Sequence, residues 1–324
     1  MTNSGLLIKL DECVYPEDFL VARLHGKQGG LFRDWELLMV SDKPAELLQD
    51  TAFYSYLRHY GADGVWRFLR LEHNWIYKRM NSRLRITFEP YFMFQETTSL
   101  IKTIRHIHAK LDANVIVQDL EHSLLNRDIQ KILSSGQGFH HTLRALEAYF
   151  KTRTNLFYGL ADQYEKNGLR GLEIFLREKF IALTLHWCNA PILKTFFSYM
   201  IDFYNCMKLA KSIRWEVPEE HVYLAGGTIG PEKLRRAYLK KKPDALLKIF
   251  PIPGAVEEIT SVIQLEKTLL VLITRVLRRW SRQRKTVGEI LFYLWEQYRY
   301  ARNLSMVIST VQLKDKIARD GIIT

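Results

Sequence analysis

The scarcity of helix-breaking residues constrains this chain more than any other feature. Its 324 residues include only 9 prolines and 17 glycines, and long intervals separate them. Within those intervals apolar residues recur at helical spacing, as along residues 65–80 and 290–308, and this spacing gives a helix one apolar face. Alternating strand-like patterns are short, at residues 84–88 and 114–117. The chain is therefore predicted to be all-α, with at most short strands at those two places.

An internal repeat indicates how the helices are organised. Gly29-Gly30 aligns with Gly226-Gly227, and Leu47-Leu48 aligns with Leu246-Leu247 once two extra residues are allowed in the later copy. A weaker middle copy begins at His122 and lacks the paired glycines. Self-similarity of this kind is typical of proteins that stack one supersecondary unit on the next.

A second recurrent segment closes each unit. Residues 97–111, 202–213 and 300–313 align with Ser99, Asn205 and Asn303 in register. We therefore expect three similar helical units, a pseudo-threefold repeat, whose residue ranges are 1–111, 112–213 and 214–324.

The stretch LAGGTIGPEKLRR, residues 224–236, resembles a phosphate-binding loop at first sight. A Walker loop needs Lys and a hydroxyl residue directly after its last glycine. Here Pro231 and Glu232 follow Gly230, and the carboxylate of Glu232 would repel phosphate. Proline suits the first position of a helix and an acidic residue suits its first turn. The stretch is predicted to begin a helix and to bind no nucleotide.

Composition favours a soluble protein with acidic partners. The chain is 47% hydrophobic and carries a formal net charge of +12, which attracts nucleic acid, anionic lipid or acidic protein surfaces without choosing among them. Cys13, Cys188 and Cys206 form no metal-binding or disulfide pattern, as is typical of a reducing compartment. We find no signal peptide or membrane-spanning stretch. The protein is therefore expected to be soluble and cytoplasmic.

Two clusters of basic residues are the candidate binding surface. They consist of Arg275, Arg278, Arg279, Arg282, Arg284 and Lys285, and of Arg235, Arg236, Lys240, Lys241 and Lys242. A solvated helix face is one interpretation. The clusters could otherwise contact acidic protein residues or lipid headgroups, or they could bind a nucleic-acid backbone with help from Trp280 and Tyr238.

Other polar residues give little indication of catalysis. His106 and His108, and the pair His140-His141, have no Cys or carboxylate in a ligand-like spacing, so they are interpreted as solvated or core-edge histidines. Cys188 and Cys206 lie in apolar surroundings and are interpreted as small buried hydrophobes. No hydrolase, zinc-protease or dinucleotide motif is present. We predict no catalytic residues, no metal site and no cofactor, and therefore no enzyme.

Three stretches together resemble the C subunit of the V-type (A/V-type) ATPases, the relative of the d subunit of the eukaryotic V-ATPase. The first is FLVARLHGKQGGLFRDWELLMVSDKPAELLQDTAFYSYL near the N-terminus, and the second is LAGGTIGPEKLRRAYLKKKPDALLKIF. The third is YLWEQYRYARNLSMVIS, in which Glu296, Arg302 and Asn303 match the family's ending. The resemblance covers essentially the whole chain, although the middle copy departs from the pattern.

This resemblance implies a mechanical role and not a chemical one. Members of the family form a funnel of three similar helical domains between the central shaft, which the D and F subunits form, and the membrane rotor ring. They bind no nucleotide and carry no proton, and they transmit torque on the cytoplasmic side of the membrane as peripheral subunits. The sequence leaves one alternative, a basic helical-repeat protein that binds nucleic acid.

Overall fold

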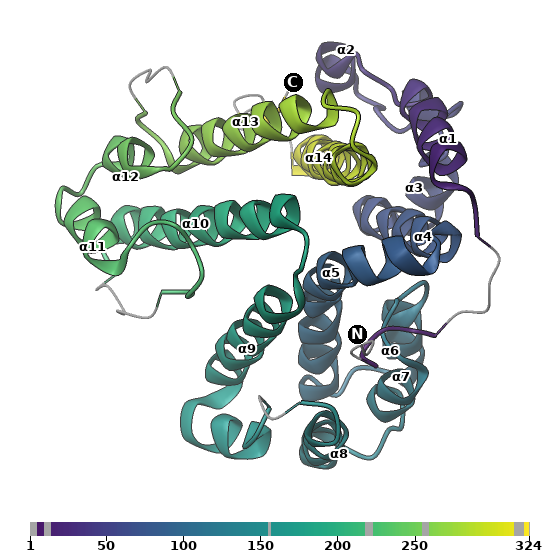
Figure 1. Ribbon diagram of the computed structural model, residues 1–324, viewed down its shortest axis with the longest axis vertical. Coiled ribbons are helices and arrows are strands. Elements are labelled where there is room, and N and C mark those ends of the chain that lie inside the picture. The colour runs from purple at the N-terminus through teal and green to yellow at the C-terminus, as the bar shows by residue number, and fades with distance from the viewer. Residues whose placement is uncertain are drawn as a thin grey trace. The chain divides into compact units, whose positions relative to one another are not determined.

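Every regular element in the described part of the chain is helical. The computed structural model describes residues 5–9, 14–154, 157–217, 223–254, 259–313 and 321–323. Within these ranges the only β pairing is an isolated antiparallel bridge between Leu7 and Leu125. The all-α prediction is confirmed (Figure 1).

The prediction of two short strands is wrong. Residues 84–88 lie in α5 (Ser82–His108) and residues 114–117 lie in α6 (Ala113–Leu120). Side-chain caps begin both helices, since Asn81 Oδ1 accepts from the Leu84 amide at 2.8 Å and Asp112 Oδ1 accepts from the Asn114 amide at 2.7 Å. These caps satisfy amides that the first helical turn leaves free, and a short alternating pattern also fits one face of a helix.

The chain divides into two compact units. Unit 1 comprises Met1–Tyr15 and Arg70–Pro191, and unit 2 comprises Pro16–Leu69 and Ile192–Thr324. The division falls within α4 (Ala62–Arg79) and at the start of α10 (Pro191–Arg214). The three-unit division at residues 1–111, 112–213 and 214–324 remains a prediction.

Unit 1 is built around the long helix α5. It packs against α9 and α6, and α7 and α8 complete the unit (Figure 1). The bounds of the other helices are α7 (Arg127–Leu133), α8 (Phe139–Lys151) and α9 (Leu160–Trp187). Inside α9, Gly168 has φ 64° and ψ −169°, which breaks the helical path; this backbone conformation is essentially restricted to glycine.

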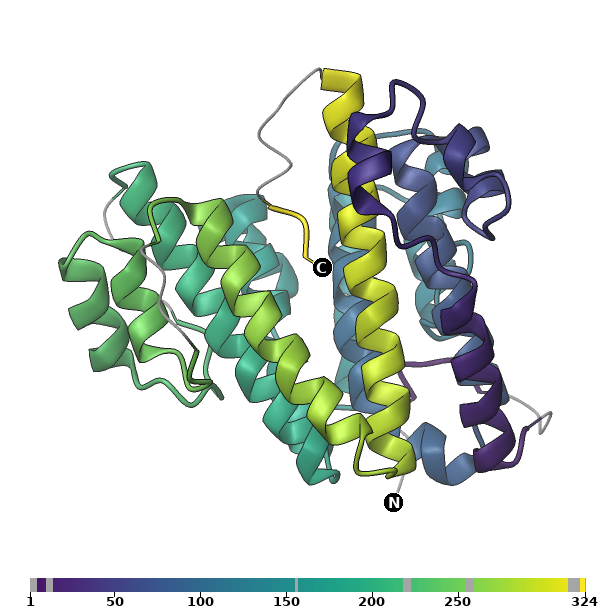
Figure 2. The ribbon, with the colours of Figure 1, turned by 90° about the horizontal axis from the view of Figure 1, so that it is seen from above.

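Unit 2 is centred on the pair α13 (Val262–Ser281) and α14 (Thr286–Leu313), with α1 (Glu17–Gly29) packed on α14. In Figure 2 the light-green α13 descends to the turn at which the yellow α14 begins. The other elements are α2 (Trp35–Val40), the 3-10 helix η1 (Glu46–Leu48), α3 (Tyr54–Tyr60), α11 (Pro231–Leu239) and α12 (Pro243–Ile249).

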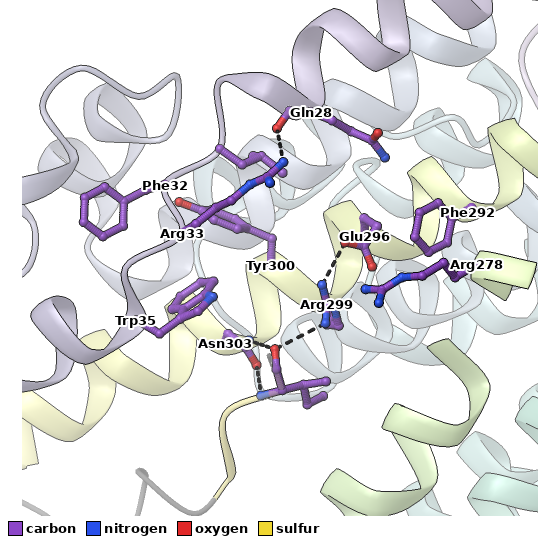
Figure 3. Close-up of a pocket in the computed structure, with 12 residues that line it drawn as sticks. Gln28, Phe32, Arg33, Trp35, Arg278, Phe292, Glu296, Arg299, Tyr300 and Asn303 are labelled. Carbon is purple, nitrogen blue, oxygen red and sulfur yellow. Dashed lines mark hydrogen bonds and ion pairs between the residues drawn. The ribbon is translucent and has the colours of Figure 1, made fainter. Parts of the chain in front are cut away.

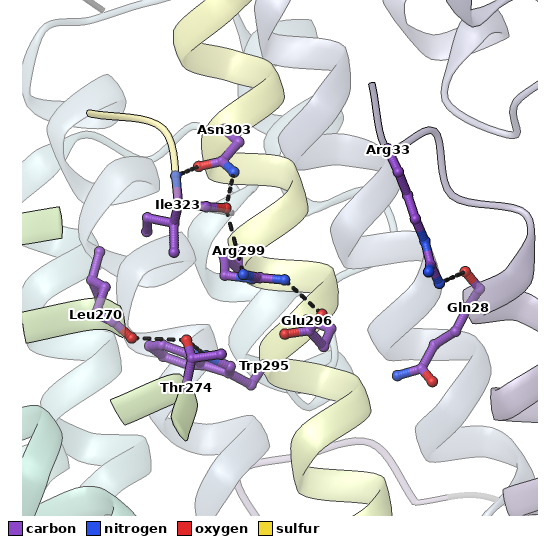
Figure 4. Close-up of polar contacts among 9 residues, drawn as sticks. All are labelled: Gln28, Arg33, Leu270, Thr274, Trp295, Glu296, Arg299, Asn303 and Ile323. Atoms are coloured by element: carbon purple, nitrogen blue, oxygen red, sulfur yellow. Dashed lines mark hydrogen bonds and ion pairs between the residues drawn. The ribbon is translucent and has the colours of Figure 1, made fainter. Parts of the chain in front are cut away.

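Buried polar contacts fix α13 to α14. Trp295 Nε1 donates to Thr274 Oγ1 at 2.8 Å, and the Thr274 hydroxyl donates to the Leu270 carbonyl at 2.8 Å (Figure 4). Further along the pair, the Arg302 guanidinium donates twice to Glu266 Oε1, at 3.1 Å and 2.8 Å. Satisfied polar contacts of this kind fix the register of two packed helices more narrowly than apolar packing does.

The three positions aligned in the sequence repeat lie beside comparable polar clamps. Asn205 on α10 binds both the N–H and the C=O of Leu224, at 2.9 Å and 3.0 Å. Asn303 on α14 does the same to Ile323, at 3.2 Å and 2.7 Å. In α5 the aligned residue is Ser99, and Glu96, one turn earlier, accepts from the Leu124 amide at 2.8 Å. Each of these long helices therefore fixes a segment that comes later in the chain.

Candidate partner-binding groove

The glycine-rich loop before α11 binds a carboxylate of the chain itself. Asp202 accepts from the Thr228 amide at 2.9 Å, from the Ile229 amide at 3.0 Å and from the Thr228 hydroxyl at 2.7 Å. Gly227 is required there, because a Cβ atom at this position would lie 2.2 Å from Asp202 Oδ1. Two amides of the loop that resembled a phosphate cradle, those of Thr228 and Ile229, are thus engaged by Asp202.

The same loop begins a helix, as the sequence predicted. Gly230 is the N-cap of α11 and Pro231 is its first residue, with Glu232 in the first turn. The helix-turn-helix element then continues through α12, which begins at Pro243. This prediction is confirmed. It could be made from the sequence because helix capping depends on neighbouring residues alone.

All residues of the two predicted basic clusters are exposed. Arg275, Arg278 and Arg279 lie on the last turns of α13, and Arg282, Arg284 and Lys285 form the turn to α14. Arg235 and Arg236 lie on α11, and Lys240, Lys241 and Lys242 follow it. Within the described ranges, none of the eleven side chains forms a salt bridge. Their charges are therefore exposed to solvent and are not paired with carboxylates of the described ranges.

Two adjoining cavities of unit 2, each of about 370 Å³, receive part of the first cluster. Gln28 and Phe292 line both cavities, so we treat them as one feature, the arginine groove. The first cavity contains Arg33, Arg278 and Arg299 (Figure 3). The second contains Arg282 and Arg284, together with His25 and Glu289.

The first cavity combines guanidinium groups with aromatic walls. Arg299 donates to Glu296 Oε2 at 2.8 Å, and both side chains are largely buried, at 14% and 17% exposure. Figure 3 shows Arg278 extending towards this pair. The Trp35 and Tyr300 rings, 5.1 Å apart, form part of the wall. Burial raises the pKa of Tyr300 above its ordinary range, so this phenol stays neutral.

Ile323, in the segment 321–323, lines one side of the first cavity. The Asn303 clamp holds Ile323, and Arg299 also reaches the Ile323 carbonyl, at 3.5 Å (Figure 4). Arg302 donates to the Gly321 carbonyl at 3.0 Å. Glu296, Arg302 and Asn303, which carry the family resemblance at this end of the chain, thus build the cavity wall and its supports.

The structure brings only part of the predicted site together. Arg278, Arg282 and Arg284 line the arginine groove, whereas the other residues of the first cluster do not. In the second cluster, Arg235 lines a separate cavity with Tyr223, Pro231 and Glu232. Sequence reasoning missed Arg33 and Arg299. Neither belongs to a run of basic residues, although both lie in stretches that carry the family resemblance.

The histidines and cysteines set aside in the sequence have ordinary surroundings. His106 Nδ1 pairs with Asp119, which also binds Lys102 at 2.9 Å, and His108 Nε2 bonds to the Tyr164 hydroxyl at 2.9 Å. Among the residues that the structure describes, no group of three or more His, Cys, Asp or Glu side chains could hold a metal ion.

The thiol of Cys206 is a poor nucleophile. Its burial, with a further contribution from the charge of Asp202, raises its pKa to about 12. Cys188 is also buried, and Cys13 lies outside the described residues. The interpretation of Cys188 and Cys206 as buried cysteines is confirmed.

Within the described ranges the protein is all-helical, and its candidate site is a groove lined by arginines. None of the helices in the described ranges is long and apolar enough to cross a membrane. The chain belongs to the ATP synthase (C/AC39) subunit family, whose sequence pattern matches residues 20–319. Members of this family are subunits of the V/A-type ATP synthases, which are membrane-associated complexes, so the resemblance found in the sequence is confirmed. No curated protein matches the chain.

Proposed function

We propose that this chain is the non-catalytic central-stalk rotor subunit of a V-type ATPase. In this role it is a socket between the shaft, which the D and F subunits form, and the membrane rotor ring, and it transmits torque for proton or sodium transport. Its place is on the cytoplasmic side of the membrane, bound peripherally. The observation that carries the proposal is the family match across residues 20–319.

The polar contacts of unit 2 support a mechanical role. A torque-transmitting subunit must resist deformation, and packed helices that are also linked by satisfied hydrogen bonds deform little. The Thr274–Trp295 and Glu266–Arg302 contacts provide such links between α13 and α14. Trp66 on α4 also donates to the Ser305 hydroxyl on α14, at 3.2 Å.

The chemistry of the candidate groups supports a non-catalytic role. Two amides of the glycine-rich loop donate to Asp202, and burial keeps the Cys206 thiol protonated. The exposed cations of both basic clusters instead suit contact with acidic partners, so all eleven residues are proposed as interface residues.

Purification of a tagged chain from solubilised membranes of its host tests the assignment. We expect subunits of the ATPase head, the shaft and the membrane ring to be recovered with it and identified by mass spectrometry. Recovery of none of these subunits would remove the rotor assignment.

The nucleic-acid alternative can be tested on the same preparation. Binding through phosphates weakens steeply as salt rises. We expect no salt-dependent shift of a labelled oligonucleotide at low ionic strength. A shift together with the absence of ATPase subunits would favour the alternative.

A further inference from the structure

We propose that the arginine groove binds an acidic segment of another subunit of the complex through its carboxylates, with the apolar side chains of that segment against the aromatic wall. The inference rests on the proposed function, because it names the kind of partner that one of its surfaces takes. It is narrower than the proposal for the eleven basic residues, since it concerns one partner segment and the groove in which that segment binds.

The arginine groove carries an excess of positive charge. Five arginines line the groove against two glutamates, Glu289 and Glu296. Glu296 is already paired with Arg299, and Glu289 lies 3.8 Å from His25. Arg278, Arg282 and Arg284 have no such acidic partner within the described ranges, so the groove retains unneutralised positive charge. Guanidinium groups bind carboxylates in a fork geometry that gives both strength and orientation.

The wall of the first cavity includes apolar and aromatic side chains. Leu31, Phe32, Trp35 and Phe292 line the first cavity beside its arginines. Arginine and aromatic side chains are the residues on which protein interfaces most depend. A nucleic-acid backbone would leave this apolar wall without a partner, whereas a peptide with alternating acidic and apolar residues satisfies both kinds of group.

The size of the two cavities suits a peptide segment. Each cavity holds about 370 Å³, near the lower end of the range for binding pockets. Such a volume accepts one or two side chains but no folded domain. Because the cavities share Gln28 and Phe292, a continuous segment can place one carboxylate near Arg278 and a later one near Arg282 and Arg284.

A photo-crosslinker in place of Phe292 tests the occupant directly. The variant Phe292→benzoylphenylalanine is expressed in the host, irradiated in membranes and analysed by mass spectrometry. We expect an adduct with a segment of another ATPase subunit that is rich in Asp and Glu. An adduct with nucleic acid, with lipid or with a segment lacking acidic residues would overturn the inference, and so would the absence of any adduct.

Paired charge reversals on α13 and its C-cap test the arginines. Arg278→Glu with Arg282→Glu reverses two groove arginines. As the control, Arg23→Glu with Arg58→Glu reverses two exposed arginines of unit 2 that line neither cavity and belong to neither basic cluster. We expect the first pair to reduce the adduct yield at residue 292 by roughly tenfold or more, and the control pair to change it by less than about twofold. Equal losses in the two double variants would overturn the inference.

A third variant separates binding from folding. Arg284 has φ 51°, in the left-handed region that favours glycine, so Arg284→Gly is expected to raise the melting temperature while lowering the adduct yield. An undiminished yield would remove Arg284 from the site. The tagged-chain purification distinguishes the two proposals, because ATPase subunits recovered without an acidic adduct would leave the rotor assignment intact and reject the groove assignment.

Discussion

Asn303 shows how much a single side chain contributes to this fold. Its amide binds both backbone polar groups of Ile323, and both residues are almost fully buried. Asn303→Ala removes the donor and the acceptor together, so we expect the free energy of unfolding to fall by about 2–3 kcal/mol. Urea denaturation measures the change.

The control for this prediction is Asn167→Ala. Asn167 is exposed and makes one hydrogen bond, to Gln163 on its own helix, so its loss should change stability by no more than about 0.5 kcal/mol. Equal effects of the two substitutions would show that the clamp does not stabilise the fold.

His73 should make stability depend on pH. It is buried with its ring 6.0 Å from those of Tyr91 and Phe92, and burial lowers its pKa from 6.5 to about 4. Between these two values the unfolded chain binds more protons than the folded one, so the free energy of unfolding falls as the pH drops. The stability is fully present above pH 6.5, and this residue removes about 3 kcal/mol of it by pH 4.

His73→Phe should remove this dependence while keeping the ring contacts. Urea denaturation at several pH values, compared between the variant and the unsubstituted chain, isolates the contribution. The raised pKa of Glu96, caused mainly by its burial, acts in both proteins and cancels in the comparison. Parallel curves would contradict the assignment to His73.

At the scale of the element, the loop before α11 depends on a glycine. A Cβ atom at residue 227 would displace the Asp202 carboxylate from the amides that donate hydrogen bonds to it. We expect Gly227→Ala to destabilise the protein by about 2 kcal/mol or more in urea denaturation, because the hydrogen bonds from the Thr228 and Ile229 amides to Asp202 lose their geometry.

Gly26→Ala is the matched control in the same unit. Gly26 lies inside α1, and no heavy atom lies within 4 Å of its Cβ position. Since alanine is the better helix former, this substitution should stabilise the protein by about 0.5–1 kcal/mol. Effects of the same sign would contradict the account of the loop.

An element could be predicted from sequence where the interactions that form it are local. The start of α11 at Gly230 and Pro231 was predicted because helix capping is local. The strand at residues 84–88 was predicted wrongly, because Leu84 and Phe88 also lie four residues apart on one buried helix face. The sequence aligns Asn205 with Asn303, but it does not show that both are backbone clamps, because that role depends on where the later segments Leu224 and Ile323 are placed.

The candidate site was predictable only where its residues are contiguous. Arg278, Arg282 and Arg284 stand in one basic run and were found from charge alone. Arg33 is remote from that run in sequence, and only the packing of unit 2 brings it to the same cavity as Arg278. No rule of composition or periodicity encodes such a meeting, since it depends on the tertiary fold.

If the proposed function is right, the chain as a whole couples hydrolysis to transport and takes part in neither reaction. The most direct measurement compares the ATPase reconstituted in vesicles with and without this chain. ATP hydrolysis is assayed beside the membrane potential, which a voltage-sensitive dye reports for either proton or sodium transport. Without the chain we expect hydrolysis by the head to continue and no membrane potential to form. Adding the chain back should restore the membrane potential. A potential formed in its absence, or hydrolysis that the head cannot carry out without it, would contradict the account.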